Sequence, residues 1–387
     1  GIRDQPRSRG RGDVYKRQTM HSIIIDRTKR LAEEPETGHN RWHPDILPIL
    51  EVNPGDEVIL QTRDCLDGQL NAASTESAFS NIDSGAVHPL TGPVMIKGAN
   101  PGDLLEVEFL DIEPEPWGFS AIMPGMGFLR DIFTDPFMVH WNIKDDWATS
   151  PQIPQVKLPA GAFMGVSGVA PSKSQLDLYN HRELELIKRG GEALPPDPAG
   201  AVPNSGRPSL EGLRTLPPRE NGGNLDIKQL TKGAKLFLPV SVEGALFSTG
   251  DAHFTQGDGE VCVMGVEMSA TVSLRFKVIK DAARKHNIVW PRFSRDGYYA
   301  NPEWAVPKRF IATTGMPITP DGENDGENLT LAARNALLHM IELLSERGFT
   351  REQAYILCSV AADLKIGNVV DVPNYVVSAV LSEDIFQ

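Results

Sequence analysis

Runs in which apolar and polar residues alternate fill the first part of the chain, between residues 23 and 113. This period of two is typical of β-strands that bury one face. The sequence Asn-Pro-Gly-Asp stands before two of the runs, at residues 53–56 and 100–103. Its proline presets the backbone angle φ at the second turn position and its glycine supplies a positive φ at the third, so we predict type II turns there. Repeated turn-and-strand units favour a jelly-roll or β-sandwich over a doubly wound sheet.

A different pattern, with apolar residues three or four positions apart, predicts helices over residues 329–346 and 351–363, the second one capped by Thr350. Earlier in the chain, residues 114 to about 218 form a stretch that is rich in proline and glycine. Within it, the sequence predicts one helix over residues 174–189. A second alternating block covers residues 235–279. The last stretch, VVDVPNYVVSAVLS, fits either a strand or a helix.

These patterns predict a mainly β fold class with α+β parts: jelly-roll or β-sandwich-like sheets, long irregular central loops and two C-terminal helices. We expect a non-native or disordered leader over residues 1–19 and an N-terminal β-sandwich part over residues 20–115. A loop-rich insertion with one helix follows over residues 116–225, and residues 226–387 hold the second β block and the C-terminal helices. We expect the parts after the leader to interleave in one unit.

Composition narrows the functional classes. The 387 residues carry a formal net charge of −13, and residues 1–19 hold six basic and two acidic side chains, so the remainder carries −17. A body this acidic repels phosphate backbones, which disfavours nucleic-acid binding. The three cysteines lie far apart and form no CxxC pair, which fits a reducing, cytoplasmic compartment. No apolar run reaches the roughly 18 residues that span a bilayer, so we expect no membrane partner.

The leader has almost no apolar residue and therefore differs from a signal peptide. Its string DVYKRQ is typical of translated vector sequence, so we expect the native chain to begin at Met20. A natural basic arm is the alternative interpretation.

The densest group of reactive side chains lies at residues 250–260, GDAHFTQGDGE. Asp251 and His253 would point the same way on an extended segment, so both could reach one metal ion. Glu260 could be a further ligand or the general base on a metal-bound water, and glycines let the backbone approach a small ligand. The candidate substrate-binding residues of this segment are Gln256, Gly257 and Gly259. The alternative is an acidic hairpin loop whose aspartates and glycines only make turns.

Three other patches carry single candidates. Asp64 ends a buried-looking strand and is either a turn residue or a metal ligand. His88, which precedes a proline, is either structural or a ligand. Asn224 follows two glycines that would let its amide project into a site and bind a carbonyl oxygen or an oxyanion, although a plain loop would have the same sequence.

Four motifs in this order resemble the acetamidase/formamidase family: residues 39–45 (HNRWHPD), 88–93 (HPLTGP), 219–226 (RENGGNLD) and 250–260. The resemblance extends from about residue 39 to residue 385, and GD-x-H-x-x-QGDGE is its most specific part. It implies hydrolysis of formamide, acetamide or a similar short amide by a β-rich homo-oligomer, from a dimer to a tetramer or larger. The residues that match polar motif positions are Asp64, His88, Asp251, His253 and Glu260. Glu243 falls where relatives carry an acidic residue, so we expect a second carboxylate role there.

The chemistry of amide cleavage suggests a role for each candidate. An amide is a poor electrophile with a poor leaving group, so we expect a divalent metal, zinc or calcium, to activate water or the carbonyl group. The candidate metal ligands are Asp64, His88, Asp251 and His253. Glu260, or Glu243 in its place, would take a proton from water and deliver it to the departing nitrogen. Asn224 or a glycine N–H would hold the oxyanion.

Two other interpretations of the same residues stay open. One is a cysteine-nucleophile amidase, for which Cys65 is the cysteine next to the candidate site, although no matching lysine motif accompanies it. The other is a jelly-roll protein that binds a small molecule or a metal without turnover. Release of ammonia separates the second interpretation from an amidohydrolase.

Overall fold

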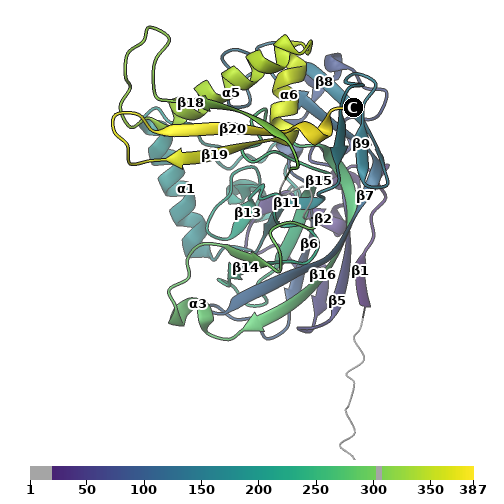
Figure 1. The fold of residues 1–387 in the computed structure, drawn as a ribbon. Helices are drawn as coiled ribbons and strands as arrows, with labels where there is room; N and C mark the ends of the chain where they lie inside the picture. Colours follow the sequence, from purple (N-terminus) through teal and green to yellow (C-terminus); the bar gives the residue numbers. More distant parts are fainter. Residues whose placement is uncertain (1–19, 302–306) are drawn as a thin grey trace, which may run out of the picture.

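Two long antiparallel strands, β7 (Leu104–Ile122) and β16 (Glu267–Ile279), form the spine of the molecule (Figure 1). The computed structural model describes residues 20–301 and 307–387, so the leader predicted over residues 1–19 lies outside the described residues. The buried residues of β16 are Glu267, Met268, Ala270, Val272, Leu274 and Phe276. From Met268 onward they alternate with more polar residues, which is the pattern of a strand with one buried face.

Within the described residues, fifteen strands join in one sheet with the central order β10-β9-β8-β7-β16-β15-β11-β13. The strands flanking the spine are β8 (Phe137–Lys144), β9 (Trp147–Thr149), β10 (Lys157–Pro159), β15 (Phe247–His253), β11 (Phe163–Gly168) and β13 (Gly222–Asn224). The branching strands are β5 (Glu57–Thr62), β6 (Leu90–Ile96), β14 (Ala234–Pro239), β17 (Arg292–Arg295), β1 (Met20–Ile23), β2 (Gly38–His39) and β4 (Leu50–Val52). The pairs β1–β5 and β4–β6 are parallel, and the other pairs of the sheet are antiparallel. The predicted mainly β fold class is confirmed.

The chain ends in a smaller unit, drawn in yellow-green and yellow in Figure 1. It consists of the antiparallel strands β18 (Phe310–Gly315), β20 (Val376–Ser382) and β19 (Ala362–Asn368), with helices α5 (Leu329–Glu346) and α6 (Arg351–Ala361) packed beside them. The helix predicted over residues 329–346 is confirmed with the same bounds. The next one ends two residues early, because the chain turns into β19 at Ala362. The cap at Thr350 is confirmed, since its hydroxyl accepts the N–H of Gln353 at 3.1 Å.

Residues 116–225 contain more regular structure than the sequence predicts. The expected helix is present as α1 (Lys173–Lys188), but the second half of β7 and strands β8 to β11 also fall in this segment. Pro114 of β7 pairs with Ala270 of β16 beside a register shift, and proline is tolerated at such bulges. Pairing along the sheet therefore overrides the loop-like composition.

Short elements complete the chain. They are β3 (Arg41–Trp42) paired with β12 (Leu213–Arg214), helices α2 (Gly206–Glu211) and α3 (Ala282–Lys285), and the 3-10 turns η1 (Leu31–Glu33), η2 (Pro35–Thr37), η3 (Glu76–Asn81), η4 (Ser84–Ala86) and η5 (Glu383–Ile385). No helix within residues 20–301 and 307–387 combines the length and apolarity that a membrane crossing requires.

Both Asn-Pro-Gly-Asp turns have the predicted geometry. Gly55 and Gly102 have φ values of 96° and 98°, and in each turn the aspartate N–H donates to the asparagine carbonyl oxygen, at 3.1 and 3.0 Å. A side chain at either glycine would strain the backbone, so each turn requires its glycine.

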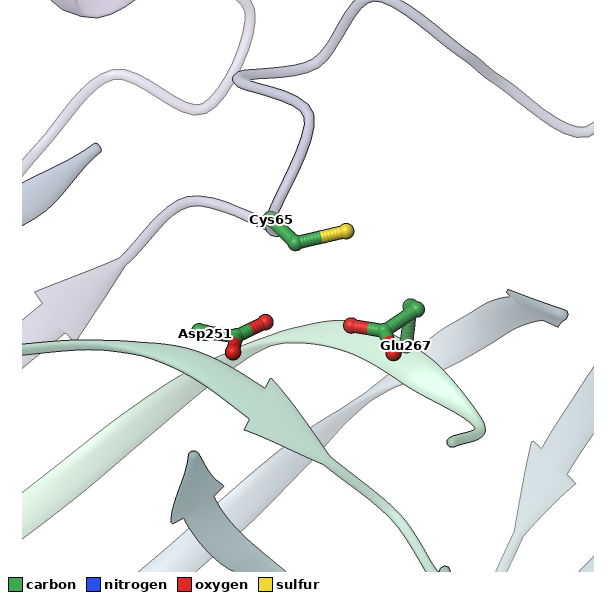
Figure 2. A group of neighbouring side chains, drawn as sticks. All are labelled: Cys65, Asp251 and Glu267. Atoms are coloured by element: carbon green, nitrogen blue, oxygen red, sulfur yellow. The ribbon is translucent and has the colours of Figure 1, made fainter. Parts of the chain in front are cut away.

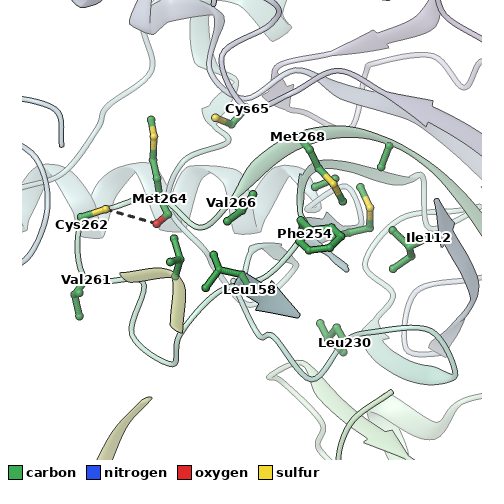
Figure 3. Packing of buried hydrophobic residues seen from close by; sticks show 14 of the residues in the cluster. Cys65, Ile112, Leu158, Leu230, Phe254, Val261, Cys262, Met264, Val266 and Met268 are labelled. Carbon is green, nitrogen blue, oxygen red and sulfur yellow. Dashed lines mark hydrogen bonds between the residues drawn. The ribbon is translucent and has the colours of Figure 1, made fainter. Parts of the chain in front are cut away.

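One hydrophobic core extends from Ile23 to Ile385 and so includes residues of both ends of the described chain. Its part beneath the β15–β16 connection holds Phe254, Val266 and Met268, which Figure 3 shows packed with Leu158 and Leu230. This packing gives the polar residues described next a rigid support.

Candidate active site

The candidate side chains come together where β15 ends and β16 begins. Asp251 and His253 lie at the end of β15, and His253 stands opposite Glu267, the first residue of β16, in the antiparallel register. Glu260 lies in the loop between the two strands. Cys65 follows β5, which also pairs with β16. Neighbouring strands therefore deliver groups from distant parts of the sequence to one place.

Three carboxylates face the same ring nitrogen of His253. Its Nε2 lies 3.3 Å from Asp251 Oδ1, 3.1 Å from Glu267 Oε2 and 3.8 Å from Glu260 Oε1. The side chains of His253, Asp251 and Glu267 are each at most 4% exposed. Buried charges at this density need a proton or a cation between them.

The other ring nitrogen of His253 already has a partner. Its Nδ1 lies 2.8 Å from Gln256 Oε1, and the amide of Gln256 is oriented by its Nε2, which donates to the carbonyl oxygen of Asp226 at 3.0 Å. Because Gln256 presents an oxygen, Nδ1 of His253 carries the proton. In the neutral imidazole, the lone pair on Nε2 then points at the carboxylates, and this is the tautomer of a metal-binding histidine whose ring is oriented by a second residue.

Burial and mutual repulsion shift the pKa values of these groups. Burial raises the pKa of Glu260 to about 8 and that of Glu267 to about 7, and burial together with the charge of Glu260 raises the pKa of Asp226 well above its ordinary value. Burial opposes ionisation of Asp251 too, but two facing imidazoles hold its pKa below the ordinary range. Burial would lower the pKa of His253, but Glu267 and Asp251 outweigh it and raise the pKa well above 6.5. Acidic and basic groups at different protonation states thus coexist in the site, as in many hydrolases.

The backbone is strained at three of these acids. Asp226, Asp251 and Glu260 have φ values of 47°, 55° and 43°, in the left-handed region that few non-glycine residues adopt. Gly165 of β11 leaves the space that two of them need, because a Cβ there would lie 2.5 Å from Asp226 Oδ1 and 2.6 Å from Asp251 Oδ2. Strain held in place by surrounding structure is typical of functional sites.

Four buried polar atoms of the site have no hydrogen-bond partner within the part of the chain that the structure describes. They are His88 Nδ1, Asn224 Oδ1, Asp226 Oδ1 and Glu267 Oε2, the last of which faces His253 without hydrogen-bond geometry. Burying such atoms unpaired costs free energy, so they point to a ligand.

The donor set fits a divalent cation. Two groups of three side chains bring their ligand atoms within 4.8 Å of one another, namely Asp226, His253 and Glu260, and Cys65, Asp251 and Glu267. Figure 2 shows the second group, in which the two carboxylates face each other below the Cys65 side chain. Nitrogen, sulfur and carboxylate oxygen suit zinc, whereas the carboxylates alone suit calcium.

Asp64 lies in the turn after β5 and belongs to neither of the two groups of candidate ligands. Its carboxylate accepts the backbone N–H groups of Leu66 at 2.9 Å and Gly68 at 3.1 Å, and burial raises its pKa to about 6. It therefore caps the turn after β5, which was the alternative interpretation of this residue. The neighbouring Cys65 lies in the site instead.

Three further candidates lie away from the cluster of acids. Glu243 is exposed in the turn before β15. The N–H of Gly257 donates to the carbonyl oxygen of Ser359 at 2.8 Å, and a Cβ at Gly259 would meet Leu364 at 3.1 Å. Both glycines thus allow close packing against the C-terminal unit, and their predicted role in substrate binding has no support from this geometry.

The C-terminal unit also holds the rest of this loop. Tyr355 of α6 donates its hydroxyl to the carbonyl oxygen of Val261 at 2.5 Å, and the N–H of Asp258 donates to Asp363 Oδ1 at 3.0 Å. These contacts fix the loop that carries Gln256.

Sequence reasoning missed two acids of the site. Glu267 occupies the register of the polar face of β16, where an acidic residue is ordinary, so the sequence held no signal for it. Asp226 ends the RENGGNLD motif, and its position after two glycines was a usable signal that pointed to Asn224 instead.

The site opens into a cavity of about 510 Å³. Its polar residues include Cys65, His88, Asn224, Asp251, Glu260 and Glu267. Burial lowers the pKa of His88, so its imidazole is neutral at pH 7. The structure thus brings the predicted His88, Asn224, Asp251 and Glu260 to one cavity.

The chain is similar to known proteins along nearly its whole length. A model of the acetamidase/formamidase family matches residues 24–387. The chain is 34% identical to a formamidase of Methylophilus methylotrophus over 95% of this chain and 94% of that protein, and 35% identical to an acetamidase of Mycolicibacterium smegmatis over 86% and 87%. It also superposes on the gamma lactamase from Delftia acidovorans with a TM-score of 0.89 and 35% identity, covering 95% of this chain and 93% of that one. Matches of this extent establish that the chain belongs to the acetamidase/formamidase family and is an amidohydrolase.

Proposed function

We propose that this amidohydrolase cleaves short aliphatic amides, such as formamide and acetamide, to a carboxylate and ammonia with water that a bound divalent cation activates. The observation that carries the proposal is the orientation of His253. Its Nδ1 proton is committed to Gln256, and its Nε2 faces three carboxylates, so this position holds either a second ring proton or a bound cation.

His253 and the surrounding acids would hold the cation. The available ligands are Asp226, His253 and Glu260 on one side and Cys65, Asp251 and Glu267 on the other. A divalent cation bound there would lower the pKa of water toward about 7 and stabilise negative charge on the carbonyl oxygen. Zinc suits the nitrogen and sulfur donors and calcium suits the carboxylates, so metal analysis of the purified protein decides between them.

The protein's own groups would move the proton and hold the substrate. Because a nearby cation favours the ionised form of a carboxyl group, Glu260 would be ionised in the cation-loaded site, where it would accept a proton from water and deliver it to the departing nitrogen. Asn224 and the neutral His88 reach the same cavity with unpaired polar atoms. Asn224 Oδ1 would accept the N–H of the substrate amide, and His88 Nδ1, when it carries the ring proton, would donate to the developing oxyanion. One such donor contributes about 3–4 kcal/mol to the transition state in comparable sites.

The test is ammonia release from formamide and acetamide by the purified protein, before and after exhaustive chelation. His253→Ala and Glu260→Gln are expected to lower kcat by at least about 10²-fold. Glu243→Gln, at an exposed carboxylate of the same chemistry, is the matched control and is expected to keep full activity. Circular dichroism and thermal melting of each variant establish that it is folded. Turnover that survives both chelation and Glu260→Gln would contradict the proposal.

The position of Cys65 favours one second candidate, covalent catalysis. Its thiol lies in the group with Asp251 and Glu267, so a carboxylate could take the thiol proton as sulfur attacks the amide carbon. Burial and these two charges raise the pKa of Cys65 well above its ordinary value, which opposes this route because it keeps the thiol protonated. Cys65→Ser distinguishes the two mechanisms: a folded but inactive variant favours the covalent one.

We further propose a cytoplasmic homo-oligomer that binds neither nucleic acid nor membrane. Acidic net charge, with 51 acidic against 38 basic residues, supports the exclusion of nucleic acid. Size-exclusion chromatography with light scattering measures the oligomeric state.

A further inference from the structure

The cavity above the candidate catalytic groups is larger than a one- or two-carbon amide requires. Its volume of about 510 Å³ lies within the range of about 300–1,000 Å³ that is typical of pockets for drug-sized ligands. Formamide fills only a small part of this space. The remaining volume has to be filled by water or by another part of the substrate.

Much of the cavity lining is apolar, and six of these residues are called the apolar wall below. They are Ile82, Val87, Met123, Met126, Leu194 and Leu216, all of which are half-buried. These residues come from three separate segments, namely the approach to β6, the loop after β7, and the chain between α1 and β13. Water in contact with such a wall is displaced favourably by an apolar group.

We propose that the preferred substrates are amides whose acyl group carries an apolar, branched or cyclic substituent of about four to seven carbon atoms, which lies against this wall. The proposal rests on the proposed amide hydrolysis and specifies its substrate class. The amide group reaches the acids around His253 while the substituent points away from them. The two methionines adapt their side chains to different substituents.

Two polar residues, Arg214 and Ser84, also line the cavity. Arg214 suggests a competing class of substrate. Arg214 donates from Nη2 to the carbonyl oxygen of Ser84 at 2.5 Å, and its buried Nε has no hydrogen-bond partner within the described residues. An amide with a carboxylate at its far end could pair with this guanidinium. The chemistry at the amide end would be the same in both cases.

A homologous series of substrates tests the proposal. We expect kcat/KM for ammonia release to rise by about fourfold per methylene from acetamide to hexanamide, the factor for burying one methylene, and to stay high for cyclohexanecarboxamide. A decline from acetamide onward, with formamide still cleaved, would overturn the substrate class and leave the proposed function standing. A preference for the monoamide of hexanedioic acid over hexanamide would overturn the apolar wall in favour of Arg214. Absence of ammonia from every amide would overturn both proposals.

Two variants test whether the apolar wall sets the preference for larger amides. Leu216→Trp fills the cavity, and Leu194→Ser makes the wall polar without adding volume. Each is expected to lower the ratio of kcat/KM for hexanamide to that for acetamide by at least about tenfold. Leu210→Trp, at a leucine of α2 that is 69% exposed, is the matched control and keeps the ratio. Leu194→Ser keeps the test decisive if the larger Leu216→Trp variant does not fold, and an unchanged ratio in folded variants would overturn the proposal.

Discussion

Glu260→Gln should change the stability of the protein in opposite directions with and without a bound cation. The substitution keeps the shape of the side chain and removes its charge. In the cation-free protein, burial raises the pKa of Glu260 from 4.5 to about 8, so ionising this carboxyl in the folded state costs up to about 5 kcal/mol at about 1.4 kcal/mol per pH unit. The side chain is 16% exposed, which lowers this cost.

The sign of the pH dependence follows from the direction of the pKa. Because the folded-state pKa is raised, the stability associated with the protonated Glu260 is fully present below pH 4.5 and is lost as the pH rises through about 8. Chelated Glu260→Gln protein should therefore match the unsubstituted protein near pH 4.5 and exceed it in stability by a few kcal/mol at pH 9. With the cation bound, the negative charge stabilises the folded state, so the same substitution should be destabilising.

Urea unfolding at pH 4.5, 7 and 9, with excess chelator or with excess zinc or calcium, measures these differences. The exposed Glu243→Gln variant is the control for effects of net charge. An equal change in unfolding free energy at all three pH values, or the same stabilisation with and without metal, would refute the assignment of Glu260 to a buried, cation-binding cluster.

Three further predictions concern residues around this cluster. Gly165→Ala should lower both metal affinity and kcat by at least roughly tenfold, because the alanine Cβ would lie within 2.6 Å of oxygens of Asp226 and Asp251. Calorimetric titration with zinc measures the affinity, and unchanged binding would show that these oxygens can move. Gln256→Leu removes the acceptor for His253 Nδ1 and should cost about 10- to 100-fold in metal affinity or activity, whereas Gln256→Glu, which keeps an acceptor oxygen, should lose less. A chain that begins at Met20 should keep full activity and an unchanged Tm, since the leader has too little apolar content to offset its ordering entropy; a Tm lower by several degrees would show that the leader packs.

The elements with strong local signals could be predicted from the sequence. Alternation and the glycine of each Asn-Pro-Gly-Asp turn fix local backbone geometry, so β5, β16 and both turns were predictable, as was α5 from its apolar spacing. The extent of β7 was not, because its second half is a strand only through pairing with β8 and β16. Non-local pairing leaves no mark on composition.

The same distinction applies to the site. Asp251 and His253 lie two residues apart on one strand, and their proximity could be inferred from spacing alone. Glu267 joins them through the antiparallel register, which the sequence does not encode in any short window. Asp64 was ambiguous because a turn-capping aspartate and a ligand aspartate look alike until the backbone N–H groups around them are known.

Residues 255–264 belong to the loop between β15 and β16, and the C-terminal unit holds this loop by hydrogen bonds. This arrangement has a consequence for biosynthesis. Ser359 and Asp363 supply the hydrogen bonds that hold Gly257 and Asp258, and they are translated about a hundred residues later. At about 5–20 residues per second, a nascent chain that already contains Glu260 waits roughly 5–20 seconds for these partners. The strands of the main sheet can pair during that interval, but the loop bearing Glu260 cannot yet form the hydrogen bonds that hold it. We therefore expect ribosome-bound chains, and chains cut short before β19, to be inactive even where most of the sheet has formed.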